Sequence, residues 1–177
     1  VGSEMCIRDR NAGAYNGEIK DCILTATVLD QSGRVRILKA DELELGYRTS
    51  IIQKEEYIVL EAEFYFESGN PEGIKAHMRD LNSRRRDKQP LEFPSAGSTF
   101  KRPEGHFAGK LIEDAGLKGY RVGDAQVSEK HCGFVVNRGE ATAEDVKKLI
   151  RDVQDKVWDE FQVKLEPEVR IIPENGL

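Results

Sequence analysis

Residues that could do chemistry are concentrated in a few short segments of this sequence. One segment, residues 94–103, carries Ser98, Lys101 and Arg102 and is bounded by a proline at each end. Hydroxyl groups followed by two cations suit an anionic ligand such as a diphosphate, and a hydroxyl beside a cation can also deliver a proton. A surface loop with solvated charges explains the same residues, and composition alone favours that simpler interpretation.

Nucleophilic catalysis and metal binding find no support in the residue types and their spacing. Ser98 lacks the GxSxG turn of a nucleophilic serine, and the histidines show no triad pattern. The cysteines are odd in number and too widely spaced for a disulfide framework or a zinc site, so no metal is expected. Their usage favours a reducing, cytoplasmic setting. The histidines and cysteines are His77, His106, His131, Cys6, Cys22 and Cys132.

Four further residues are candidates for substrate contacts or acid catalysis. The planar guanidinium of Arg48 matches a carboxylate bidentately, although most such arginines pair on the surface. His131 precedes an apolar stretch and could hydrogen-bond a ligand, although a lone histidine is more often structural. Glu166 and Glu168 stand at the entry to the last expected strand, where partial burial would suit an acid. Their spacing does not choose between these two glutamates.

Apolar periodicity predicts the elements that must position these residues. Strands are expected at 22–29, 35–38, 57–66, 133–136 and 169–172, with a hairpin turn between the first two. Along 57–66, alternate residues from Ile58 to Phe66 are expected to share the buried face. Helices are predicted from Pro71, over 107–115, and from the capping pair Thr142 and Asp145. Helices followed by strands in this order indicate an α+β fold.

The charge of the chain excludes some classes of partner. Its 177 residues include 27 Lys plus Arg against 32 Asp plus Glu, a formal charge of -5, so a general nucleic-acid binder is excluded. The arginine run 84–86 is flanked by Asp80 and Asp87, which favours a solvated helix end. No apolar run reaches the roughly 18 residues of a membrane span, so no membrane association is expected.

Six short motifs follow one another in an order typical of a known enzyme family. They are Asn11–Tyr15, Gly46–Ser50, Pro94–Pro103, Lys118–Ala125, His131–Asn137 and Leu165–Arg170. Together they resemble the UDP-N-acetylenolpyruvoylglucosamine reductases, flavoenzymes that make UDP-N-acetylmuramate for peptidoglycan. The resemblance covers nearly everything after residue 10. It implies that NADPH reduces a bound FAD, and that hydride then passes to UDP-N-acetylglucosamine enolpyruvate.

The resemblance also implies roles for residues that composition left open. Ser98 would donate the proton, Arg48 would hold the substrate carboxylate, and Glu168, rather than Glu166, would assist as an acid. Three further residues would contact the sugar nucleotide: Lys101, Arg102 and His131. Small residues at the start of the first motif suit a backbone that passes close to a ligand, and here they would bind the cofactor: Asn11, Ala12, Gly13 and Ala14.

The domain organisation follows from the same resemblance. Residues 1–10 resemble a translated sequencing adapter and are expected to be a non-native tail. The others are expected to form the end of a vanillyl-alcohol-oxidase-type FAD-binding domain (11–70), a connecting helix (71–89) and a small α+β substrate-binding domain (90–177). We therefore expect a C-terminal fragment of the shorter form of the family. It would lack the glycine-rich flavin loop, be inactive by itself, and expose an apolar face on residues 11–70.

Two other functions stay open at this point. A non-catalytic nucleotide-sugar binding module would need Lys101 and Arg102 but neither Ser98 nor Glu168. A different reductase on the same flavin fold would have no need of Arg48 paired with Glu168. The resemblance itself predicts a cytoplasmic monomer whose partners are UDP-N-acetylglucosamine enolpyruvate and NADPH, with no nucleic acid and no membrane.

Overall fold

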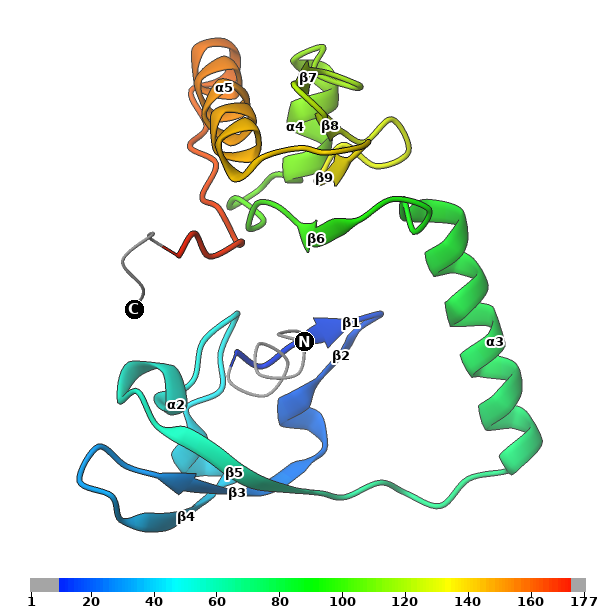
Figure 1. Cartoon of the computed structure of the whole chain (residues 1–177). Helices are drawn as coiled ribbons and strands as arrows, with labels where there is room; N and C mark the ends of the chain where they lie inside the picture. Colours follow the sequence, from blue (N-terminus) through cyan, green and yellow to red (C-terminus); the bar gives the residue numbers. More distant parts are fainter. Residues whose placement is uncertain (1–9, 173–177) are drawn as a thin grey trace. The chain divides into compact units, whose positions relative to one another are not determined.

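The computed structural model describes residues 10–172 and divides the chain into two compact units, Val1–Asn70 and Pro71–Leu177 (Figure 1). Of the predicted non-native tail, only Arg10 is described, and it is buried, whereas Cys6 and its neighbours lie outside the described residues. The division falls at the start of the predicted connecting helix, which groups with the second unit.

A three-stranded antiparallel sheet in the order β4-β3-β5 forms the framework of the first unit. β3 (Ile23–Leu29) and β4 (Val35–Lys39) make the predicted hairpin, and β5 (Ile58–Phe64) pairs with the other edge of β3. Five short elements complete the described part of the unit: the hairpin strands β1 (Gly13–Ala14) and β2 (Gly17–Glu18), and the helices η1 (Ile19–Asp21), η2 (Ala40–Leu43) and α2 (Ile51–Lys54). The core lies between the sheet, α2 and η2 (Ala40–Leu43), and its buried members are Ile23, Ala26, Val28, Leu38, Leu43 and Ile52.

The predicted alternation along β5 is wrong in the first half of the strand. The ladder between β3 and β5 contains one extra residue in β5, at Leu60. Such a bulge shifts the pairing register by one residue and so exchanges the inward and outward faces. Ala62 and Phe64 pack on the core as predicted, but beyond the bulge Val59 does so. Ile58 and Leu60 are instead 60% and 52% exposed. Phe66, also predicted on the buried face, lies beyond the end of β5 and is 72% exposed.

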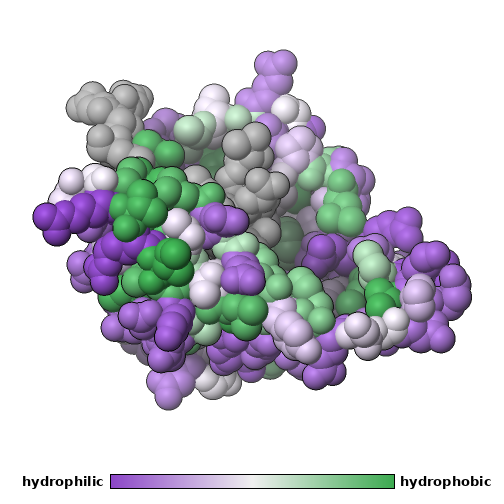
Figure 2. Space-filling model, turned by 90° about the horizontal axis from the view of Figure 1, so that it is seen from below, coloured by the Kyte–Doolittle hydropathy of each residue, from purple (hydrophilic) through white to green (hydrophobic). Residues whose placement is uncertain are grey.

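The sheet of the first unit exposes apolar side chains, as expected for residues 11–70. Val35 and Ile58 lie directly opposite Leu29 on its two neighbouring strands, so the three side chains share one face. Val35, Ile37 and Ile58 are among the most exposed large apolar residues of the unit. In Figure 2, hydrophobic side chains gather in patches on the face of the molecule that is in view. The expectation of exposed apolar surface in this unit is confirmed.

The second unit opens with the long helix α3 (Pro71–Lys88), as the sequence predicts. None of its residues, all of which the structure describes, is buried, and Ile74 and Met78 of its apolar face are about half exposed. Lys130 Nζ donates a hydrogen bond of 2.7 Å to the carbonyl oxygen of Arg86 near the end of α3. A cation is favourable there because the last carbonyl groups of a helix carry partial negative charge. Lys130 therefore ties the helix to the rest of its unit.

A four-stranded antiparallel sheet and two helices make up the remainder of the second unit (Figure 1). The sheet has the order β6 (Ser95–Ser98), β9 (Phe134–Asn137), β8 (Ala125–Val127) and β7 (Arg121–Val122). α5 (Ala143–Phe161) packs against β7, β8 and α4 (Ala108–Asp114). The three layers enclose one core, whose fully buried members include Ile112, Ala125, Leu149, Val153 and Val157. This is the predicted α+β arrangement.

The helix ends follow the signals in the sequence. The Thr142 hydroxyl accepts a hydrogen bond of 3.1 Å from the Asp145 amide, and the Asp145 carboxylate accepts one of 2.9 Å from the Thr142 amide. This reciprocal capping box opens α5. Gly116, with φ +71°, follows the end of α4. Among residues 10–172, no helix is long and apolar enough to cross a membrane.

The strand predicted at 169–172 does not form. Pairing occurs earlier, where Pro167 bridges to Phe100. Residues 169–172 are irregular, and Ile171 and Ile172 are 53% and 64% exposed. The apolar residues at 169–172 correctly indicate a segment next to the sheet. The pairing itself lies a few residues earlier in the chain than they predict.

Candidate active site

Ser98 lies at the end of a bulge in β6. Ser95 and Ser98 pair with β9 residues that are only two positions apart, so Ala96 and Gly97 together oppose one residue of β9. Gly97 has φ +89°, in the left-handed region that favours glycine. The Ser98 residue that follows is exposed. Bulges beside active sites commonly re-aim a side chain, and this one ends on the predicted proton donor.

Glu168 is held close to Ser98 by a short ladder of backbone hydrogen bonds. The Glu168 amide donates to the carbonyl oxygen of Thr99 at 2.8 Å, and the Lys101 amide donates to the carbonyl oxygen of Glu166 at 2.8 Å. The segment around Pro167 thereby extends the sheet beyond β6. Glu168 is half-buried. The structure thus places the predicted proton donor and the predicted acid on two neighbouring, hydrogen-bonded segments.

Lys101 and Glu166 form an ion pair on the same ladder. Lys101 Nζ lies 3.2 Å from Glu166 Oε2, and the two side chains are 40% and 61% exposed. The spacing of residues in the sequence does not decide whether Glu166 or Glu168 is the acid. Glu166 is the more exposed of them and already accepts a hydrogen bond from a cation, whereas Glu168 has the partial burial expected of an acid.

Arg102 folds back on the loop that follows it. Its Nε donates to the carbonyl oxygen of His106 at 3.3 Å, and its guanidinium lies 3.9 Å from the centroid of the Phe107 ring. A cation over an aromatic face is attracted by the ring quadrupole. Arg102 is exposed, and these two contacts order the loop.

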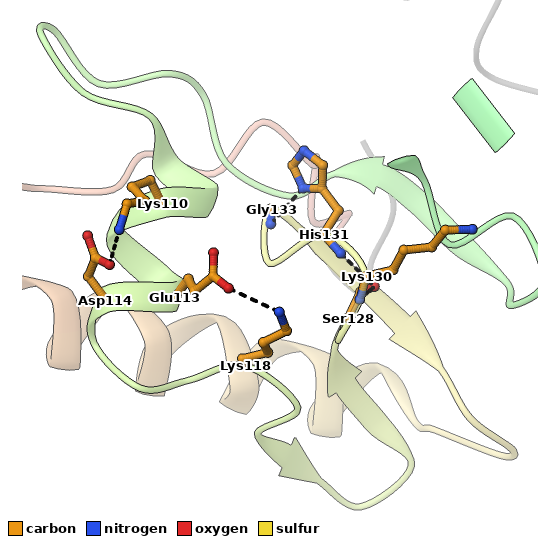
Figure 3. A network of polar contacts seen from close by, with 8 residues as sticks. All are labelled: Lys110, Glu113, Asp114, Lys118, Ser128, Lys130, His131 and Gly133. Atoms are coloured by element: carbon orange, nitrogen blue, oxygen red, sulfur yellow. Dashed lines mark hydrogen bonds and ion pairs between the residues drawn. The ribbon is translucent and has the colours of Figure 1, made fainter. Parts of the chain in front are cut away.

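His131 sits in a network of defined hydrogen bonds (Figure 3). Its Nδ1 accepts from the Gly133 amide at 3.1 Å, and its own amide donates to Ser128 Oγ at 3.2 Å. The ring packs edge-on against Phe134, with centroids 5.0 Å apart. Because Nδ1 accepts a hydrogen bond, the proton of the neutral ring is on Nε2. The exposed His131 can therefore offer a donor to a ligand.

Arg48 lies in the first unit, at the tip of a tight turn. Gly46 and Thr49 exchange backbone hydrogen bonds of 3.1 and 3.4 Å around Tyr47 and Arg48. Arg48 has φ +55°, which is uncommon for a residue with a side chain and often marks a functional position. Its guanidinium lies 5.9 Å from the centroid of the Tyr47 ring.

Three of the four predicted cofactor-binding residues line one hollow together with Arg48. This hollow has a volume of about 420 Å³, and Asn11, Gly13, Ala14, Tyr47 and Arg48 contribute to its wall. Ala12 does not line it, but its carbonyl oxygen accepts a hydrogen bond of 3.1 Å from the Ile19 amide. The exposed Gly13 is packed closely, since a Cβ there would meet Glu18 Cγ at 2.9 Å.

Asn11 holds the two walls of this hollow together. Its Nδ2 donates to the carbonyl oxygen of Gly46 at 3.1 Å and to Glu18 Oε2 at 3.0 Å, and its Oδ1 accepts from the Lys20 amide at 2.9 Å. Lys20 and Asn11, which hydrogen-bond the Glu18 carboxylate, hold its pKa below the usual range. The charges of Arg48 and Lys20 are balanced by those of Glu18 and Asp21, so the hollow is not a basic phosphate cradle.

The predicted site residues therefore fall into two groups. Arg48 and three of the four predicted cofactor-binding residues line one hollow in the first unit. Ser98, Lys101 and Glu168 lie on two hydrogen-bonded segments of the second unit, and Arg102 and His131 are on loops of the same unit. Among the described residues, no group of three or more His, Cys, Asp or Glu is arranged to hold a metal ion.

The sequence does not predict an apolar groove that the structure shows in the second unit. It has a volume of about 600 Å³ and lies between β6, β9, the first turns of α5 and residues 169–172. Lys147 and Arg170 are its charged lining residues. The apolar pair Ile171 and Ile172 was the available signal, but it was interpreted as a strand.

Comparisons with known proteins identify the family. Residues 89–172 match the model of the C-terminal domain of UDP-N-acetylenolpyruvoylglucosamine reductase. The reductase of Lachnoclostridium phytofermentans is 63% identical over 164 residues, which cover 93% of this chain and 53% of that protein. The reductase of Agathobacter rectalis is 62% identical over 164 residues, covering 93% of this chain and 52% of the relative. The chain belongs to the UDP-N-acetylenolpyruvoylglucosamine reductase family.

A solved member of this reductase family shares the fold. The crystal structure of the Thermus caldophilus reductase matches with a TM-score of 0.79 and 35% identity, covering 94% of this chain and 59% of that one. The family predicted from the six motifs is thereby confirmed. The chain spans about half the length of the curated relatives it matches.

Proposed function

We propose that this chain forms the substrate-binding part of a reductase that converts UDP-N-acetylglucosamine enolpyruvate to UDP-N-acetylmuramate for peptidoglycan, with NADPH and FAD. One observation carries the proposal. The ladder that joins Glu168 to Thr99 sets the predicted acid beside the strand of the predicted proton donor, inside the domain that matches the family. A nucleotide-sugar binding module would have no need of this pairing.

Binding and protonation of the enolpyruvyl group would depend on Arg48, Glu168 and Ser98. Hydride addition to its methylene carbon leaves negative charge on the adjacent carbon and on the carboxylate. The guanidinium of Arg48 would hold the carboxylate bidentately, and Glu168 would assist as an acid at the intermediate. Ser98 Oγ would deliver its proton to the adjacent carbon and recover one from solvent, which its exposure permits.

Lys101, Arg102 and His131 would bind the sugar nucleotide. Lys101 would exchange its ion pair with Glu166 for the ligand's diphosphate, and the exposed Arg102 guanidinium would contribute a second cation. His131 would donate from Nε2, because the Gly133 amide occupies Nδ1. These three residues supply charge and orientation, and none of them needs to change covalently.

The residues of the first unit fit one part of the implied FAD. The hollow of about 420 Å³ is within the roughly 300–1,000 Å³ usual for small-molecule pockets, and its wall includes exposed backbone of Gly13 and Ala14. Its balanced charges suit an uncharged ring better than a diphosphate. Asn11, Gly13 and Ala14 would line that part of the cofactor, with Arg48 at its edge, and Ala12 would support them through its backbone hydrogen bond with Ile19. Bound FAD, reduced by NADPH, would supply the hydride.

The proposed reductase acts in the cytoplasm as a monomer, on small molecules rather than on nucleic acid or membranes. The acidic net charge of -5 is consistent with this choice of partners, since it gives no general attraction for phosphate polymers.

The experiment that tests the proposal joins this chain to a complete flavin-binding half. In a chimaera, the chain replaces the segment that it matches in the Lachnoclostridium phytofermentans reductase. We expect the purified chimaera to be yellow and to oxidise NADPH only when UDP-N-acetylglucosamine enolpyruvate is present. A chimaera that binds FAD as the parent does, yet shows no substrate-dependent oxidation, would contradict the proposal. Binding of UDP-N-acetylglucosamine without turnover would favour the binding module instead.

A further inference from the structure

The β6 bulge sets two residues, Ala96 and Gly97, opposite Val135 of β9. On the β6 side of β9, the Asn137 amide donates to the carbonyl oxygen of Pro94 at 2.9 Å, and the carbonyl oxygen of Gly133 accepts from the Thr99 amide at 2.9 Å. Val135 lies midway between these two positions and faces the two bulged residues.

Two hydroxyl groups bind the backbone of Val135 from the two ends of the bulge. The Val135 amide donates to Thr99 Oγ1 at 3.1 Å, and Ser95 Oγ donates to the carbonyl oxygen of Val135 at 2.7 Å. Ser95 Oγ also accepts from the Gly97 amide at 3.3 Å, inside the bulge. The hydroxyls at the two ends of the bulge therefore both fasten it to the same residue of β9.

Thr99 also links the strand after the bulge to the segment that carries Glu168. It is only 3% exposed, and its amide, carbonyl and hydroxyl bind three different residues, Gly133, Glu168 and Val135. The strand segment that follows the bulge is thus fixed on both sides. A shift of Thr99 would move Ser98 and Glu168 relative to each other, because Ser98 precedes it in the chain and Glu168 is hydrogen-bonded to it.

We propose that Ser95 and Thr99 are positioning residues that hold the bulge open and so aim Ser98 at the substrate. The proposal rests on the proposed function, in which Ser98 delivers the proton. Neither hydroxyl is assigned a contact with the substrate. Their effect is on geometry, and misplacement of a reacting group by about 1 Å can lower a rate about 100-fold.

The first test measures the hydrogen bonds in this chain without any ligand. Hydrogen exchange of the Val135 amide is compared between the original chain, Thr99→Val and Thr99→Ser. Valine fills the same volume without an acceptor, whereas serine keeps the hydroxyl. We expect exchange to accelerate at least about tenfold in Thr99→Val and to stay within about twofold in Thr99→Ser. Equal protection in Thr99→Val would overturn the proposal.

The second test measures the two half-reactions in the chimaera. We expect Thr99→Val to lower substrate-dependent turnover about 10- to 100-fold, with KM changed less than about threefold and reduction of the flavin by NADPH unchanged. Thr99→Ser should restore turnover. Ser95→Ala, at an exposed position that tolerates substitution better, should lower turnover in the same half-reaction, and it carries the test if Thr99→Val fails to fold. Faster exchange with undiminished turnover would overturn the positioning role.

The two proposals fail in different ways. If the unsubstituted chimaera binds FAD but never reduces the substrate, the proposed function is wrong, while the exchange data still decide whether the hydroxyls hold the bulge. If the unsubstituted chimaera is active and all three variants match it in the substrate half-reaction, the function stands and the positioning proposal is wrong.

Discussion

The amide of Glu168 donates a hydrogen bond to the carbonyl oxygen of Thr99 across 2.8 Å, and this bond ties the last described segment of the chain to the residue that follows Ser98. The two positions are far apart in sequence. Their pairing makes Glu168 a neighbour of the segment that carries Ser98. Backbone hydrogen bonds, rather than mobile side chains, therefore set the separation of the two segments.

The role of Ser98 predicts a selective loss in one half-reaction. In the chimaera, Ser98→Ala should lower reduction of the enolpyruvyl substrate about 100- to 10,000-fold, the usual effect of removing a positioned acid. Reduction of the flavin by NADPH should change by less than about twofold, because Ser98 has no part in that step. Stopped-flow absorbance of the flavin separates the two rates.

Ser83→Ala is the matched control for this prediction. Ser83 is exposed on α3, so its hydroxyl is removed from the same unit without touching the candidate site. An equal fall of both half-reactions in Ser98→Ala would mean that the variant disturbs cofactor binding, and the assignment of Ser98 as proton donor would then be wrong.

The ion pair between Lys101 and Glu166 predicts a gain in affinity when it is broken. Glu166→Gln removes the anion that competes with a ligand diphosphate for Lys101 Nζ. Exposed pairs of this kind are worth roughly 0.2–1 kcal/mol, so the dissociation constant of UDP-N-acetylglucosamine should fall about 1.5- to fivefold. Calorimetry on this chain measures the effect. The exposed Glu140 gives the control Glu140→Gln, and equal affinities in Glu166→Gln and this control would show that Lys101 does not bind the diphosphate.

Local signals in the sequence were sufficient to predict most of the elements. The capping box at Thr142 and the apolar spacing after it place α5, and Gly116 marks the end of α4, because both depend only on neighbouring residues. The wrong predictions concern segments whose structure depends on how strands pair with one another. The bulge at Leu60 inverts half of β5, and the strand expected at 169–172 is replaced by pairing at Pro167. Neither event has a local signature in the residues.

The candidate site was predictable only in part. Spacing identified Ser98, Lys101 and Arg102 as one chemical segment, but the choice of Glu168 over Glu166 required the family resemblance. The hydroxyl pairs around Val135 could not be foreseen, because they depend on the exact register of β6 against β9. Sequence patterns therefore predict the candidate residues, whereas tertiary pairing sets their geometry.

Arg48 predicts a loss that a lysine cannot repair. Lysine keeps the charge, but its single ammonium group cannot bind both carboxylate oxygens in the fork geometry of a guanidinium. Losing one hydrogen bond to a charged group costs roughly 1.5–3 kcal/mol, so Arg48→Lys should lower kcat/KM for the enolpyruvyl substrate about 10- to 150-fold in the chimaera. Arg34→Lys, on the exposed turn between β3 and β4, is the control. If Arg48→Lys matches that control, the carboxylate is held elsewhere.

The capping box of α5 predicts how stability depends on pH. Hydrogen bonds from the Thr142 amide and hydroxyl, at 2.9 and 2.8 Å, hold the pKa of Asp145 below its usual range. A carboxylate with a lowered folded-state pKa adds stability above its unfolded pKa of about 3.9, and this contribution is lost as the pH falls through the folded-state value. Asp145→Asn should therefore lower the urea midpoint at pH 7 but change it little near pH 2. Trp158, the single tryptophan, lies in α5 and reports the unfolding by fluorescence. Asp155→Asn, on an exposed position of the same helix, is the control, and a variant that loses as much stability at pH 2 as at pH 7 would contradict the linkage.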